Sequence, residues 1–447
     1  SLKTWSLFFL EHLDILIDFG GFGNNHKLKD VIDQGTASRN RKQNYPALVW
    51  DSSTSLTVVQ QQEMNGIIEI WRDSAERGSN LARTNLGYAY DAGQGVKQDD
   101  TEALQWYQKA ADDGDGHAYF KIGNVLEVRG DASGAMAAYG ESARLDPKAA
   151  KPLHNIGQLL HSAKDMPSAM KEYKAALRLN PAHASTYANL GALYSEMGRT
   201  ERAEAAFRSA IRFDENVSDA RYNLAKLLRD KGDASGAEGE FRAVLNINAD
   251  DADSHFELGV LLSAKDDTEG AIVHLSVACE LAPQDILNHY ILAVNLMTMG
   301  KFDEAIISYG ECLTIDPDFF KAHFNLGFAS DYIGDKAAAE DSFLKAVKLD
   351  PSHQKARLGY TNLLIEREDF EKAETQYRAL IELAPESADY RYYLGTILHS
   401  IGDIKGARGE FLKALAIDSG HILAGRALLE SMRLLKGPSS GWGGLII

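Results

Sequence analysis

Small and large apolar residues recur along this chain with a period of 34 residues. In the segment 184–217, Leu190 and Gly191 lie in one helical pattern, and Ala203 and Phe207 lie in a second. Apolar residues spaced three and four apart indicate amphipathic helices. Each period therefore predicts two helices joined by a short turn, and a fixed period of this length indicates a repeat architecture.

The same frame continues without insertion over residues 116–421, which makes nine units. Position 8 of the units is small: Gly123, Gly157, Gly191, Ala225, Gly259, Ala293, Gly327, Thr361 and Gly395. Position 20 is always alanine: Ala135, Ala169, Ala203, Ala237, Ala271, Ala305, Ala339, Ala373 and Ala407. Position 24 is large: Tyr139, Tyr173, Phe207, Phe241, Leu275, Tyr309, Phe343, Tyr377 and Phe411. The small residues let the two helices approach closely, and the large side chain fills the space between them.

Glycine and proline mark the ends of the helices in each unit. A glycine that suits the left-handed conformation ends the first helix at Gly130, Gly198, Gly232, Gly300, Gly334 and Gly402. A proline that cannot continue the second helix stands at Pro147, Pro181, Pro283, Pro317, Pro351 and Pro385. This pattern closely resembles the tetratricopeptide repeat family over residues 116–421. The resemblance implies an all-α fold, a right-handed superhelical solenoid of helical hairpins.

The segment before residue 116 carries a longer version of the unit. The run from Gly93 to Val96 lengthens the turn, and Trp106 and Tyr107 follow in the second helical pattern. These residues are similar to the Sel-one-like repeat, a slightly longer relative of the tetratricopeptide repeat. Residues 68–82 look like the second half of a degenerate preceding copy. We therefore assign residues 55–115 to Sel-one-like repeats, the first of them degenerate.

The start of the chain has a different character. Residues 1–19 predict an amphipathic helix, and residues 20–54 predict an extended linker with few periodic apolar residues. We expect the helix to pack on the solenoid end or on a partner subunit. Attachment to a membrane surface is the alternative, and the acidic residues on its polar face make that alternative less favourable.

After the ninth unit, residues 422–436 predict one more helix, which we expect to cap the solenoid. Its pattern places Leu423, Leu428 and Met432 inward and charged residues outward. A terminal helix with a polar outer face closes the open end of a repeat array. Residues 437–447 predict a flexible apolar tail, and membrane contact is expected only through this tail or the N-terminal helix.

Composition excludes several classes of protein. The 447-residue chain has a formal net charge of −17, which argues against nucleic acid as a partner, since phosphate binding needs clustered Lys and Arg. Cys279 and Cys312 fall where small buried residues are expected, so we interpret both as reduced core cysteines. No apolar run is long enough to span a bilayer. An intracellular location, in the cytosol or an organelle interior, is favoured, although the chain starts with Ser1 and a targeting peptide could have been removed.

The resemblance implies that first helices line a concave groove, with positions 2, 5, 6, 9, 12 and 13 facing it. Position 6 is asparagine in several units: Asn155, Asn189, Asn223 and Asn325. A side-chain amide both donates and accepts, so a ladder of amides could hold an extended peptide backbone. A comparable ladder occurs in the repeat arm of protein O-linked N-acetylglucosamine transferases. The alternative is that these asparagines only follow the repeat consensus.

Apolar residues replace polar ones at groove positions in the later units. The candidate partner-binding residues of this kind are Tyr222, Phe256, Val260, Tyr290, Ile291, Val294, Met297, Phe324 and Phe328. Adjacent exposed apolar residues on a concave wall mark a binding patch, so we interpret them as a site for a helical or extended segment. The alternative is that they pack between helices of a tightly wound solenoid.

Neither metal nor catalytic chemistry is indicated. His255, His289 and His323 recur at position 4 of successive units, but the spacing between units is too wide for one metal ion, so a structural role is favoured. No nucleophile elbow, phosphate-binding loop or zinc-protease motif is present, and we predict no cofactor.

The sequence therefore predicts a non-catalytic scaffold or adaptor that binds segments of other proteins in its groove. A narrower interpretation is a subunit or assembly factor of a hetero-oligomeric complex. The alternative function is the substrate-recruiting arm of an O-linked glycosyltransferase-type enzyme whose catalytic part lies elsewhere.

Overall fold

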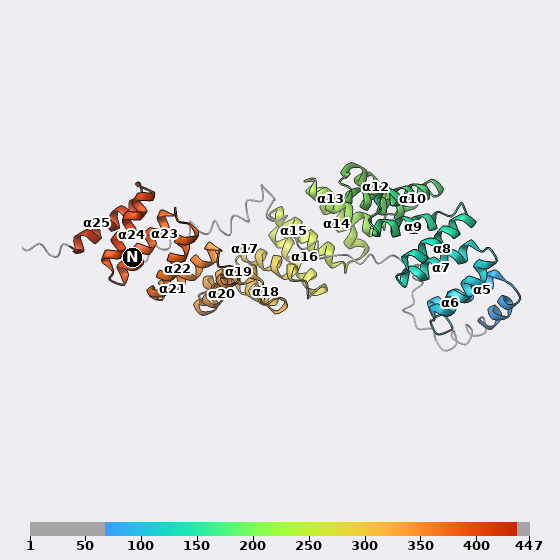
Figure 1. The fold of residues 1–447 in the computed structure, drawn as a ribbon, viewed down its shortest axis with the longest axis horizontal. Coiled ribbons are helices and arrows are strands. Elements are labelled where there is room, and N and C mark those ends of the chain that lie inside the picture. The colour runs from blue at the N-terminus through green and yellow to red at the C-terminus, as the bar shows by residue number, and fades with distance from the viewer. Residues whose placement is uncertain (1–67, 436–447) are drawn as a thin grey trace, which may run out of the picture. The chain divides into compact units, whose positions relative to one another are not determined.

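The structure is a computed structural model, and it describes residues 68–435 (Figure 1). The expected N-terminal helix, the linker and the apolar tail lie outside these residues. The described residues contain helices and turns and no strand, as the periodic pattern predicts. No helix among residues 68–435 is both long and apolar enough to cross a bilayer.

The chain forms two compact units, which are described separately. In the first unit, residues 68–76 are helical, and ten helices follow: α5 (Asn80–Ala92), α6 (Asp100–Asp112), α7 (Gly116–Val128), α8 (Ala132–Leu145), α9 (Ala150–Ser162), α10 (Met166–Leu179), α11 (Ala184–Glu196), α12 (Thr200–Phe213), α13 (Ser218–Asp230) and α14 (Ala234–Ile247). Consecutive helices pair as hairpins, from α5 with α6 to α13 with α14.

The second unit starts at Asp251 and contains eleven helices: α15 (Ala252–Ala264), α16 (Thr268–Leu281), α17 (Ile286–Thr298), α18 (Phe302–Ile315), α19 (Phe320–Ile333), α20 (Lys336–Leu349), α21 (Gln354–Glu366), α22 (Phe370–Leu383), α23 (Ala388–Ser400), α24 (Ile404–Ile417) and α25 (Ile422–Leu435). They pair from α15 with α16 to α23 with α24, and α25 packs on α24 and α23. The solenoid of helical hairpins is confirmed within each unit.

Each hairpin is held together by the contact that the small and large positions predict. A Cβ atom added at Gly191 would lie 2.6 Å from the ring of Phe207, which is 1% exposed. The alanines at position 20 are buried, and so are the aromatic rings at position 24. The fully buried rings are those of Tyr139, Tyr173, Phe207, Phe241, Tyr309, Phe343 and Phe411. Because a side chain at Gly191 would occupy the space of the ring, the glycine permits the close approach of α11 and α12.

The turn between the two helices of a hairpin adopts the left-handed conformation. The expected glycines have positive φ, for example 67° at Gly198. Three units place Lys164, Asp266 and Glu368 there, with φ of 62°, 63° and 60°. Side chains with a Cβ seldom adopt this conformation, and these three positions show that the hairpin imposes it even without glycine.

Aspartate begins most of the second helices, a feature that the repeat pattern had not indicated. The carboxylate of Asp233 accepts a hydrogen bond of 2.9 Å from the Gly236 amide, and Asp403 accepts one of 2.8 Å from Gly406. The same N-cap occurs at Asp131, Asp165, Asp267, Asp335 and Asp369. The side chain satisfies an amide that the first turn leaves without a partner.

Both cysteines are buried and free, as expected. Burial raises the pKa of the Cys279 thiol and of the Cys312 thiol to about 12, so both are thiols rather than thiolates at neutral pH.

Helix α25 departs from its expected orientation. Leu423 is 50% exposed and Met432 is 36% exposed, so their assignment to the inward face is wrong. Ala424 and Ser431 are the fully buried residues, and Leu428 is half-buried against the core of the preceding hairpins. The helix is rotated relative to the prediction, so part of its apolar surface faces outward.

Candidate functional site

The first helices of neighbouring hairpins contact one another within each unit. Helix α11 contacts α9 and α13 in the first unit, and α17 contacts α15 and α21 contacts α19 in the second. In a curved array of hairpins, the helices that contact their equivalents in the next hairpin lie on the concave side. The surface that the first helices form is therefore the inner surface of each unit. The inner surface is therefore the candidate protein-binding surface.

The position-6 asparagines lie half-buried on this inner surface. Asn155 donates to Asn124 Oδ1 at 3.5 Å, and Asn325 donates to the Tyr290 hydroxyl at 3.2 Å. The side chains of Asn189 and Asn223 make no recorded hydrogen bond within residues 68–435. These two amides, on α11 and α13, are therefore available to a bound polypeptide, whereas Asn155 and Asn325 already bind their neighbours.

Basic side chains gather on the inner surface at the start of the first unit. The Lys121 Nζ lies 5.3 Å from the centre of the Tyr88 ring. Burial lowers the pKa of Lys121, Asp91 opposes this shift, and Lys151 adds to it. Burial and the nearby charge of Lys121 also lower the pKa of His117. Asp91 and Asp115 lie among these basic side chains, so charges of both signs meet at this part of the inner surface.

His154, at position 5 of its unit, is buried beneath this surface and hydrogen-bonded. Its Nδ1 lies 2.8 Å from Thr186 Oγ1, which in turn lies 2.7 Å from His183 Nδ1. The hydroxyl can donate to one ring and accept from the other, so at least one imidazole supplies a proton. Burial first, and then His183, lowers the pKa of His154 from 6.5 to about 3.

This burial predicts acid sensitivity of the first unit. Below pH 6.5 the unfolded chain binds a proton at His154 while the folded chain does not, so stability falls as the pH drops from about 6.5 towards 3. At pH 5 the loss is expected to be about 2 kcal/mol. Urea unfolding at pH 7 and pH 5 measures it, and His154→Phe should remove most of the difference because position 5 is aromatic at Phe120 and Tyr222. An equal loss in the variant would contradict this assignment.

The structure separates the expected apolar patch into two groups. Tyr222, Phe256, Val260, Tyr290, Ile291 and Met297 are each 7% exposed or less, so they pack between helices as the alternative interpretation stated. The expectation that these six side chains are exposed is wrong, because other side chains cover them: Tyr222 packs edge-on against Phe241, and Tyr290 packs against Tyr309 and Phe319. Val294, Phe324 and Phe328 remain half-buried. Burial also raises the pKa of Tyr290 to about 12, so its hydroxyl stays protonated.

Two residues of the half-buried group, Phe324 and Phe328, form an aromatic surface on α19 together with Phe320. The Phe320 and Phe324 rings are stacked, with centres 6.0 Å apart, and Phe328 meets Phe324 edge-on at 5.1 Å. His353 also contacts the Phe324 ring, at 4.8 Å. Leu358, half-buried on the next first helix, packs against the same buried core residues as these phenylalanines do. We call Phe320, Phe324, Phe328 and Leu358 the aromatic stripe.

The recurring histidines have a structural role that the sequence could not specify. His289 Nε2 lies 3.1 Å from the Pro283 carbonyl oxygen, and His323 Nε2 lies 2.9 Å from that of Pro317. Arg357 and Arg391 reach the corresponding carbonyls of Pro351 and Pro385. In these four units, the side chain at position 4 binds the carbonyl of the turn that precedes its own helix. No group of side chains within residues 68–435 has the arrangement of a metal site.

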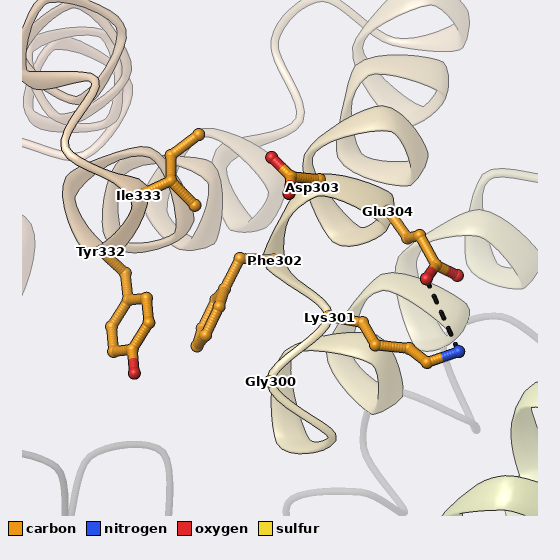
Figure 2. Close-up of a pocket in the computed structure, with 7 residues that line it drawn as sticks. All are labelled: Gly300, Lys301, Phe302, Asp303, Glu304, Tyr332 and Ile333. Atoms are coloured by element: carbon orange, nitrogen blue, oxygen red, sulfur yellow. Dashed lines mark ion pairs between the residues drawn. The ribbon is translucent and has the colours of Figure 1, made fainter.

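A shallow pocket of about 210 Å³ lies where α17 ends, α18 begins and α19 ends (Figure 2). The Phe302 and Tyr332 rings stack with their centres 3.8 Å apart and their planes at 26°. Tyr332 is 67% exposed and Ile333 is 44% exposed. Lys301 pairs with Glu304 at 3.5 Å, and in Figure 2 this pair points away from the rings. The pocket is small and open, and it holds no arrangement of groups suited to catalysis.

Comparison with known proteins agrees with this architecture. Models of the tetratricopeptide repeat match residues 148–216, 196–257, 288–319, 320–353 and 362–422, and a model of the Sel1 repeat matches residues 80–115. The chain belongs to the tetratricopeptide repeat family and carries a Sel1 repeat ahead of those repeats. No curated protein matches the sequence significantly.

Several solved structures are similar. The structure of c5321, described as a protective antigen of uropathogenic Escherichia coli with an SLR fold, is 20% identical, and the match covers 82% of this chain and 83% of that one with a TM-score of 0.57. YrrB, described as a TPR protein with an unusual peptide-binding site, is 25% identical over 41% of this chain and 95% of its own, with a TM-score of 0.39. MamA is 24% identical over 36% and 95%, with a TM-score of 0.35. The likeness to c5321 shows the fold alone.

Proposed function

We propose that this protein is a non-catalytic scaffold or adaptor that binds segments of other proteins on its inner surfaces, as a subunit or assembly factor of a larger complex. The aromatic stripe is the observation that carries this proposal. Three phenylalanines lie half-buried side by side on α19, and Leu358 is half-buried on the next first helix, so each can still lose exposed apolar surface. Burial of such surface is the main favourable term in association.

The surroundings of the stripe suit a polypeptide. Lys321 lies beside it, and burial lowers the pKa of this lysine, so its charge is incompletely hydrated. An apolar anchor with a charged group at its edge is the usual anatomy of a protein-binding hot spot. Separately, on the inner surface of the first unit, Asn189 and Asn223 offer amides that can pair with an extended backbone.

A library of random displayed peptides tests the proposal, with affinities of the enriched peptides then measured by fluorescence polarisation. We expect enriched segments to carry a large apolar side chain. Phe324→Ala should weaken their binding about 30-fold, which corresponds to about 2 kcal/mol, because it removes the central ring of the stripe.

Leu344→Ala is the matched control for this experiment. Leu344 is also half-buried against the same core cluster but lies on α20, a second helix. The Leu344→Ala variant should lose packing against the core to a similar extent as Phe324→Ala, but its affinity for the peptides should stay within about twofold of the wild-type affinity. Failure to enrich any segment, or equal affinity in the Phe324→Ala variant with an unchanged circular dichroism spectrum, would sink the proposal.

A further inference from the structure

Helix α25 occupies the place of the first helix of one more hairpin. It begins at Ile422, with the same spacing from the start of α23 at Ala388 that separates the other first helices. Ala424 and Ser431 are fully buried in its packing on the preceding hairpin. At position 2, Leu423 is 50% exposed, and three further apolar residues are exposed on another face of the helix: Ile422 by 68%, Leu429 by 61% and Met432 by 36%.

The exposed residues lie on the face that a second helix covers in a complete hairpin. Position 8 in α23 is Gly395, whose added Cβ would lie 2.5 Å from the Phe411 ring of α24. The equivalent position in α25 is Leu429. Gly425, at position 4, lies one turn before it, and a Cβ added there would meet no atom within 4 Å. On this face the projecting Leu429 side chain therefore lies beside an open space at Gly425.

This pattern is symmetrical about Ala427. Gly425 and Leu429 lie two residues to either side of it, and Ile422 and Met432 lie five residues to either side. If two such helices pack antiparallel about a two-fold axis, Leu429 of each meets Gly425 of the other, and Ile422 meets Met432. Self-complementarity of this kind is the requirement of a two-fold interface. A large side chain over a glycine is also how the hairpins of this chain pack internally.

The charges beside the face match the same arrangement. Arg426 and Glu430 are both exposed, and neither makes an ion pair with the side chains of residues 68–432. In the antiparallel arrangement, Arg426 of one copy lies close to Glu430 of the other, twice by symmetry. Opposite charges across an interface fix the register and disfavour the parallel arrangement.

We propose that the exposed face of α25 binds the same face of a second copy of this chain and forms a two-fold dimer. The surface is distinct from the inner surfaces proposed for partner binding, so it would join two scaffolds without occupying either. A 14-residue helix is only about 20 Å long, so the dimer contact buries less accessible surface area than a standard protein–protein interface does. The dissociation constant is therefore expected to be on the order of 10–100 μM.

Sedimentation velocity of the full chain across that concentration range tests the dimer. We expect a monomer–dimer equilibrium in the wild type and a weakening of at least about tenfold with Leu429→Glu, which places a carboxylate in the contact. Leu81→Glu is the matched control, since Leu81 is a 73% exposed leucine on α5, and it should leave the equilibrium unchanged.

A charge exchange tests the antiparallel register. Arg426→Glu should weaken the dimer about tenfold, because the introduced carboxylate would then face Glu430 of the other copy. Adding Glu430→Arg to the same chain should restore the wild-type constant. A wild type that stays monomeric, whether because other residues of the same chain or a different protein covers α25, overturns the proposal. A dimer that survives Leu429→Glu, or a double variant as weak as the single one, also overturns it.

Discussion

Replacing Phe207 with alanine is expected to lower the free energy of unfolding of the first unit by about 3–5 kcal/mol. The ring is 1% exposed and fills the space opposite Gly191 between α11 and α12. Its removal leaves a cavity that the surrounding helices can close only in part, since the position-20 alanine, Ala203, is already fully buried beside it. The loss therefore includes both the transfer energy of the ring and the cost of the cavity.

Hydrogen exchange of the α11 and α12 amides, read together with the urea midpoint, measures this effect. In a repeat array each hairpin contacts only its neighbours, so the loss of protection should be greatest in this hairpin and those beside it. Phe213→Ala on the same helix is the control. Phe213 is 38% exposed and stacks on Tyr187 with ring centres 5.6 Å apart, so its loss is expected to be about 1 kcal/mol. Equal losses in the two variants would contradict the packing described here.

Replacing Gly395 with leucine is expected to destabilise the second unit by about 3 kcal/mol. Even the first atom of a side chain at this position would lie 2.5 Å from the ring of Phe411, which is itself 1% exposed and has no free space to move into. The two helices must therefore separate, and the buried contact along α23 and α24 is lost with them.

Gly409→Leu separates this steric effect from any general effect of changing a helical glycine. Gly409 lies on α24 in the same hairpin, and a Cβ there would meet no atom within 4 Å. Leucine is the better helix former, so this variant should be as stable as the wild type or up to about 1 kcal/mol more stable. Thermal and urea unfolding of the two variants provide the comparison. A Gly395→Leu variant with wild-type stability would show that the hairpin does not depend on the close approach.

The groove positions differ in exposure although the sequence pattern treats them alike. Phe324 and Phe328 are half-buried on the inner surface, where a partner could reach them. Tyr290 and Phe256 occupy position 5 of their units, as Phe324 does, yet they are 5% and 2% exposed. The type of residue and its position are the same, so exposure depends on which side chains surround each ring. Tyr290 is covered by the rings of Tyr309 and Phe319, whose centres lie 6.1 and 5.4 Å away.

Sequence by itself determined the helical hairpins, their period, the small-against-large contact and the left-handed turns. It could do so because each of these features depends on residues within one repeat, where a side chain and its partner are close in the sequence. Tertiary structure decided three further features. Lys164, Asp266 and Glu368 adopt the left-handed conformation because the hairpin requires it. The position-4 side chains of four units, among them His289 and His323, bind the carbonyls of the preceding turns.

The orientation of α25 is the third feature that tertiary structure decided. Its pattern of apolar residues is compatible with more than one inward face, and the choice depends on which atoms of α23 and α24 the helix meets. Packing there buries Ala424 and Ser431 and leaves Leu423, Leu429 and Met432 exposed. A periodic sequence identifies the apolar residues of a helix, but only its neighbours in space determine which of those residues are covered.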